Sequence, residues 1–186
     1  MAVGRWQLAV LCCALSACRT TTTTTPIASL DPNAAERSLM RIRATSGDKT
    51  QSFRALLEYS PGAMLLTAYT PLGTSAMRLY ASGDRVVFLN DAENTSWTGT
   101  PAEFAASFGF FAATPVTMAE LILGRRTSAP GVNISYDPPA FPPKHVVVTH
   151  GGQRLDIEHL ESRYTTATVH EPKMPRGYRC CVPPHL

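Results

Sequence analysis

The sequence lacks the features that mark several common classes of protein. Beyond its first residues it has no apolar run approaching the roughly 20 residues that a membrane-spanning helix needs. It has no basic cluster, and its formal net charge is only +3 over 186 residues. Because proteins that bind nucleic acids carry a basic patch or stripe, we expect no nucleic-acid partner.

Catalytic motifs are also missing. The sequence contains no Gly-x-Ser-x-Gly elbow, no zinc-binding helix motif and no phosphate-binding loop. The histidines are scattered over predicted strands and the C-terminal tail: His145, His150, His159, His170 and His185. We interpret His145 and His159 as ordinary strand or surface residues. The aspartates at turns and loops have backbone reasons to be there: Asp84, Asp91 and Asp137. We therefore expect no enzyme, no bound metal and no cofactor.

The N-terminus has the pattern of an export signal. Arg5 gives it a basic start, and residues 8–15 form an uncharged run that is too short to span a bilayer. Residues 15–18, Leu-Ser-Ala-Cys, have the Leu-small-small-Cys order of a lipobox. We expect residues 1–17 to be a lipoprotein signal peptide and Cys18 to carry a diacylglycerol after cleavage. The alternative is an ordinary signal peptide with an incidental cysteine.

Residues 18–35 are expected to form a lipidated tether. Threonines 20–25 are polar, and the tract closes at Pro26, so it cannot bury apolar surface and need not fold. Two or three acyl chains anchor a protein stably to a membrane. Arg19 is not the aspartate of an inner-membrane retention signal, which favours the periplasmic face of the outer membrane. Loss of Arg5 leaves 17 − 1 = 16 basic against 14 acidic residues, a net charge of +2.

Cysteine is scarce in the part that is expected to fold. Three of the five cysteines leave with the signal or are acylated: Cys12, Cys13 and Cys18. The adjacent pair Cys180 and Cys181 remains, within a proline-rich tail predicted over residues 165–186. In the oxidising periplasm this pair can form a disulfide with itself, pair between chains or stay reduced. A local disulfide is the simplest of these interpretations.

Short antiparallel strands are predicted over residues 38–90. Met40 and Ile42 alternate with Arg41 and Arg43, which is a period-two pattern, and similar alternation follows in the next segments. Turns fall at Gly-Asp or Pro-Gly pairs near residues 47, 61 and 83. The segment 64–69 is apolar on both faces. Later strands are expected at 132–136, 145–149 and 153–164, the last two joined by a Gly-Gly hairpin turn.

Two short amphipathic helices interrupt these strands. Thr100-Pro101-Ala102-Glu103 is a capping-box signature with proline at the first helical position, and Gly109 can end that helix. The second helix is predicted from about Thr114 to Gly124. Isolated helices of this length are marginal in water. We therefore expect each to pack against the sheet.

Four stretches in order resemble the LolB-type outer-membrane lipoprotein receptors. They are the strand-loop-strand 64–79 with Pro71-Leu72-Gly73 at its turn, the helix 100–109, the helix 115–124 and the segment 141–160. The chain departs from the family in a shorter span between residues 124 and 143, in Leu121 near the position of a tryptophan, and in its tail. It therefore resembles a divergent member.

The resemblance implies a mainly β fold over residues 36–164. The sheet would be an incomplete, strongly curved antiparallel β-barrel, with short helices covering its mouth and an apolar cavity for acyl chains. A sheet that is apolar on both faces is consistent with such a cavity. The candidate lining residues are Met40, Ile42, Phe53, Leu57, Met64, Leu66, Met77, Leu79, Phe104, Phe108, Met118 and Leu121. The alternative is that these side chains fill one another's space as a dry core.

The function implied is transfer of lipoproteins to the outer membrane. In that family a periplasmic LolA-like carrier hands over lipoproteins, and an exposed leucine on a loop assists membrane insertion. By position this leucine is Leu72, although a turn residue can also pack inward. We expect a monomer that binds the acyl chains of lipoproteins or lipids. The alternatives are an accessory lipoprotein with a filled core that binds a protein partner, and a carrier of free lipid.

Overall fold

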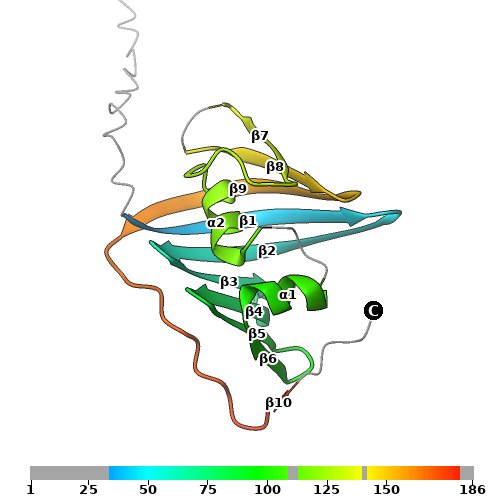
Figure 1. The fold of residues 1–186 in the computed structure, drawn as a ribbon, viewed down its shortest axis with the longest axis vertical. Helices are drawn as coiled ribbons and strands as arrows, with labels where there is room; N and C mark the ends of the chain where they lie inside the picture. Colours follow the sequence, from blue (N-terminus) through cyan, green and yellow to red (C-terminus); the bar gives the residue numbers. More distant parts are fainter. Residues whose placement is uncertain (1–33, 109–112, 140–141, 181–186) are drawn as a thin grey trace, which may run out of the picture. The chain divides into compact units, whose positions relative to one another are not determined.

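The structure, a computed structural model, describes residues 34–108, 113–139 and 142–180. They form one ten-stranded sheet in the order β10-β6-β5-β4-β3-β2-β1-β9-β8-β7 (Figure 1). Its strands are β1 (Ala35–Ser46), β2 (Lys49–Ser60), β3 (Ala63–Tyr69), β4 (Ser75–Ser82), β5 (Arg85–Asn90), β6 (Thr95–Gly99), β7 (Asn133–Asp137), β8 (His145–His150), β9 (Gln153–Thr165) and β10 (Arg179–Cys180). The sheet is open because its edge strands, β10 and β7, are each paired on one side only.

The expected fold class is confirmed. Every strand pair except β10–β6 is antiparallel, and two eight-residue helices, α1 (Pro101–Phe108) and α2 (Pro115–Ile122), accompany the sheet. β1 to β6 form a meander of adjacent strands, and β1 also pairs with β9 along its whole length, from Ala35↔Thr165 to Ser46↔Gln153. The first strand therefore lies inside the sheet. The predicted signal, Cys18 and the threonine tract lie outside the described residues and remain predictions.

The period-two alternation determines which side chains the helices cover. We call the face that carries Met40, Ile42, Leu57 and Met64 the inner face, because these buried residues pack with both helices in the main core. The opposite, outer face of β1 carries Arg37, Arg41 and Arg43, which are exposed.

The predicted caps are present at both helices. Thr100 N–H donates to Glu103 Oε2 at 2.8 Å, and Glu103 N–H donates to Thr100 Oγ1 at 3.2 Å, which is the reciprocal pair of a capping box. At α2 the Thr114 hydroxyl accepts from Thr117 N–H at 3.2 Å. The hydrogen bonds from Thr100 hold the pKa of Glu103 below its ordinary value. Each helix therefore begins where the sequence predicts.

Two elements were not predicted. β6 contributes the buried Trp97 to the inner face. The described part of the predicted tail packs against the sheet: residues 166–178, which we call the strap, run beside the outer face of β3–β6 and lead into β10 (Figure 1). Cys180 is an exposed residue of β10, while Cys181 lies outside the described residues, so their pairing remains a prediction.

Candidate functional site

The inner face gathers the residues predicted to line a cavity. Seven of the twelve are buried in one core cluster: Met40, Ile42, Leu57, Met64, Phe104, Met118 and Leu121. Four more are half-buried against that cluster: Phe53, Leu66, Leu79 and Phe108. Met77 is half-buried on the same face. The set is thus brought together, and its buried part is a packed core.

On the inner face of β3 and β4, the larger apolar side chains differ in burial along the strands. The register aligns Tyr59 with Met64 and Met64 with Ala81, and all three are buried. One step along the strands, Leu66 pairs with Leu79 and both are half-buried, while Met77 follows at the end of β4 that adjoins the β3–β4 turn. The half-buried large side chains of β3 and β4 therefore lie toward the turn that joins these strands, while the small side chains of Ala55 and Ala68 at the same level are buried.

A cluster of aromatic rings packs α1 against the inner face of β5 and β6. The ring of Phe104 lies 5.7 Å from Trp97 and 4.8 Å from Phe108, and Phe108 lies 5.2 Å from Phe88. Phe104 and Trp97 are buried, whereas Phe88 and Phe108 are half-buried. Such ring pairs contribute beyond their buried area. Neither Phe88 nor Trp97 was predicted to lie on the inner face: residues 86–89 are apolar at every position, so they assign no face to Phe88, and residues 91–99 have no clear apolar alternation around Trp97.

Leu72 projects from the β3–β4 turn at that same end. Its side chain is 92% exposed, so the inward-packing alternative is wrong. Gly73 N–H donates to the Thr70 carbonyl at 2.9 Å and Thr70 N–H donates to the Thr74 carbonyl at 2.8 Å, which closes the turn on itself. Pro71 presets the turn geometry, and Gly73 adopts a φ of +82° that favours glycine. The leucine is held outward by a short, hydrogen-bonded turn, and its role in a membrane remains a prediction.

A buried ion pair fixes the end of α2 to the sheet. Arg125, just after α2, donates to Glu36 Oε2 at 3.1 Å, with side chains only 9% and 1% exposed. The Arg125 guanidinium also lies 4.9 Å from the centre of the Tyr59 ring. Burial raises the pKa of Glu36, and the hydrogen bond from Arg125 acts against that rise. A buried carboxylate needs such a partner.

His159 is a half-buried residue of strand β9, in line with its interpretation as a strand histidine, and it belongs to a second polar cluster beside α2. Its Nε2 lies 3.1 Å from the Ile122 carbonyl, which can only accept, so Nε2 donates. Nδ1 then accepts from the Ser38 hydroxyl at 2.8 Å, and Ser38 lies 2.9 Å from Ser162 Oγ. Burial lowers the pKa of His159, outweighing the contribution of the Ile122 carbonyl, which raises it. The histidine is thus held neutral.

The neutral His159 makes folding stability depend on pH. Below its ordinary pKa of 6.5 the unfolded chain binds a proton that the folded chain excludes. Stability is therefore full above 6.5 and is lost as pH falls from 6.5 toward the lowered folded-state pKa, at up to about 1.4 kcal/mol per pH unit. Urea unfolding at pH 7.5, 6.5 and 5.5 measures this loss. In the variant His159→Gln, which keeps a donor and an acceptor but does not titrate, the free energy of unfolding should fall less between pH 7.5 and 5.5 than it does in the wild type. An equal fall in both proteins would contradict this assignment.

Two ion pairs lie in a polar hollow outside the inner face. A hollow of about 900 Å³ on the outer face of β1 and β9 has Arg41 and Glu158 2.6 Å apart and Arg154 and Asp156 2.7 Å apart. Within the described ranges, no group of three His, Cys, Asp or Glu side chains could hold a metal ion. No helix in the described part of the chain is long and apolar enough to cross a bilayer.

Comparison with known proteins finds similarity among solved structures alone. No protein family model matches the chain, and no curated protein matches it. Among solved structures, the chain is similar to a LolA superfamily protein from Nitrosomonas europaea. The match has 6% sequence identity, covers 74% of this chain and 89% of that chain, and has a TM-score of 0.49.

Proposed function

We propose that this protein is a non-enzymatic lipoprotein, anchored through Cys18 at the periplasmic face of the outer membrane, whose inner face binds acyl chains. It would receive lipoproteins from a LolA-like periplasmic carrier and insert them into that membrane. The observation that carries the proposal is the coincidence of two features at one end of the sheet. Half-buried apolar side chains, among them Leu66, Met77 and Leu79, adjoin the turn that exposes Leu72.

Physical chemistry connects these two features to transfer. Acyl chains leave water for apolar surface, with about 0.8 kcal/mol gained for each buried methylene. Methionine side chains adapt to such chains. A bilayer offers more apolar volume than a shallow protein site, so the last step needs no nucleotide. The exposed Leu72 on the β3–β4 turn would enter the bilayer first. It would thereby shorten the distance over which the acyl chain is exposed to water during transfer.

The proposal is tested on residues 26–186 exported without the lipid anchor, a segment that contains every described element. We expect co-purified lipid or acylated cargo in mass spectra of the wild type. Leu66→Arg should lower that amount at least about tenfold, since it places a charge among apolar side chains. Leu56→Arg, at a half-buried position on the outer face of the neighbouring strand, should retain it. Leu72→Glu should retain bound lipid but lose transfer of a fluorescent acyl chain to vesicles.

Each outcome separates the alternatives. Absence of any bound lipid or acylated cargo contradicts the proposal and favours the accessory protein with a filled core, which the seven fully packed lining residues support. Leu72→Glu with normal transfer removes the insertion role of that loop. Depletion in cells distinguishes a receptor, which would leave lipoproteins on the periplasmic carrier, from a carrier of free lipid, which would not.

A further inference from the structure

The strap, residues 166–178, covers a second apolar cluster on the outer face. Tyr80, Val87 and Leu89 of β4 and β5 are 9%, 2% and 0% exposed. Val169 and Tyr178 of the strap pack against them. On the exposed surface, Glu171 receives two hydrogen bonds from Arg85, at 2.9 and 3.0 Å. The strap is therefore an integral part of the sheet's outer layer.

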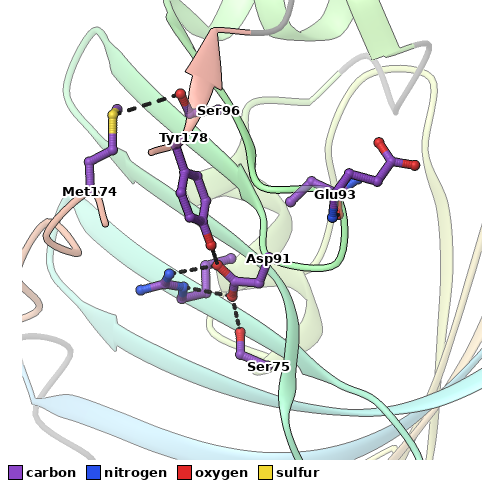
Figure 2. Close-up of polar contacts among 8 residues, drawn as sticks. Ser75, Asp91, Glu93, Ser96, Met174 and Tyr178 are labelled. Carbon is purple, nitrogen blue, oxygen red and sulfur yellow. Dashed lines mark hydrogen bonds and ion pairs between the residues drawn. The ribbon is translucent and has the colours of Figure 1, made fainter. Parts of the chain in front are cut away.

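The end of the strap converges on Asp91, the first residue after β5. The Tyr178 hydroxyl donates to Asp91 Oδ1 at 2.5 Å (Figure 2). Arg78 donates to the same carboxylate at 2.6 and 3.0 Å. Ser75 donates to its other oxygen from the opposite side (Figure 2). Burial alone would raise the pKa of Asp91, but these hydrogen bonds outweigh it and hold that pKa low. Asp91 is thus a charged acceptor shared by three donors.

Asp91 connects the strap to the base of the Leu72 turn. Ser75 directly follows Thr74, whose carbonyl and hydroxyl both bond to Thr70 across the turn, at 2.8 Å each. The backbone N–H of Asp91 also donates to the Ala76 carbonyl at 2.9 Å. Hydrogen bonds therefore connect Tyr178 through Asp91 to Ser75, and the peptide bond from Ser75 to Thr74 continues this path to the residues that close the turn.

Backbone pairing holds the strap's end in place independently of its side chains. Arg179 N–H donates to the Asn94 carbonyl at 3.0 Å, and β10 pairs with Thr95 and Ser96 of β6. Ser96 Oγ also lies 3.7 Å from the Met174 sulfur (Figure 2). A change at the Tyr178 hydroxyl can therefore be made without releasing the whole strap.

From these contacts we infer that Tyr178 is a positioning residue, which fixes the orientation of the exposed Leu72 turn through Asp91 and Ser75. The consequence for membrane insertion rests on the proposed function. The strap would then be the part of this chain that aims Leu72 in a fixed direction from the end of the sheet.

The test compares Tyr178→Phe with Glu171→Gln in the full chain held in detergent micelles. Glu171→Gln is the matched control, because it weakens a strap contact that has no path to the turn. Amide hydrogen exchange at Thr70 and Gly73 should become about tenfold faster in Tyr178→Phe, because a charge-assisted hydrogen bond is lost. Exchange at Leu66, in the middle of β3, should not change. Ser75→Ala should reproduce the effect from the turn side.

Two results would overturn the inference: unchanged exchange at Thr70 and Gly73 in Tyr178→Phe, or equal acceleration in Glu171→Gln, which would make the strap a general support of the sheet. The membrane step is measured separately, from the blue shift of a Leu72→Trp variant in vesicles. If that shift is absent while exchange responds as expected, the insertion role in the proposed function fails and the positioning role of Tyr178 stands.

Discussion

Arg125→Met is expected to destabilise the protein by about 3–5 kcal/mol at pH 7, because it leaves the Glu36 carboxylate buried without its partner. It also removes the cation from the Tyr59 ring. Glu36 already has a raised pKa, and loss of Arg125 should raise it further. A carboxyl with a raised folded-state pKa is penalised as pH rises above its ordinary value. The loss should therefore be smaller at pH 5 than at pH 7. Urea unfolding at the two pH values measures it.

The double variant Glu36→Leu with Arg125→Met is the control. Replacing a buried ion pair by apolar side chains is often neutral or stabilising, so the double variant should recover most of the loss. If the single Arg125→Met variant loses less than about 1 kcal/mol of unfolding free energy, the ion pair behaves as a solvent-exposed one, which contributes little to stability. A double variant as unstable as the single one would show that Arg125 acts mainly through Tyr59.

Phe104→Ala is the second large effect that we expect, at about 3–5 kcal/mol. Phe104 is the buried ring of α1 and packs between Trp97, Phe88 and Phe108. Its loss leaves a cavity under a helix of eight residues that has little stability of its own. Thermal unfolding of residues 26–186 measures the change, and loss of the α1 signal in circular dichroism should accompany it.

Phe108→Ala is the matched control on the same helix. Phe108 is half-buried at the end of α1, so its truncation should cost clearly less stability than that of Phe104. If the inner face binds acyl chains, Phe108→Ala should lower the amount of co-purified lipid more than it lowers the unfolding temperature. An equal or larger loss of stability at Phe108 would mean that this end of the inner face is filled core.

The alternation of the sequence was sufficient to predict most strands and the inner face. Met40 and Ile42 in β1, and Leu155 and Ile157 in β9, lie on the face that the period of two assigns to them. The capping residues located both helices to within a residue or two. These signals are local, since each depends on neighbours within a few positions of the chain.

The polar contacts that hold α2 could be only half predicted. Extending the alternation back from Met40 places Glu36 and Ser38 on the inner face, and extending it forward from Ile157 places His159 there as well. That pattern signals buried polar groups in need of partners. It could not identify Arg125, 89 positions from Glu36 in the chain, because no local period connects them.

The strap escaped prediction for a related reason. Residues 166–178 are rich in proline and charge and show no periodicity, which is typical of a tail. They are ordered by contacts that their own sequence does not encode: the apolar patch of Tyr80 and Val87, and the carboxylate of Asp91. The exposure of Leu72, in contrast, follows from the short turn that carries it.

The place of β1 between β2 and β9 also constrains the order of folding. Its pairing with β9 joins residues about 120 positions apart, so that half of its hydrogen bonds must wait for the last third of the chain. Contacts between such distant residues slow folding. Until they form, β1 presents an unpaired edge, which invites association with other chains. A newly made chain with this topology therefore has an incompletely paired sheet until β9 is synthesised. A chaperone that shields the β1 edge during that time would raise the yield of folded protein.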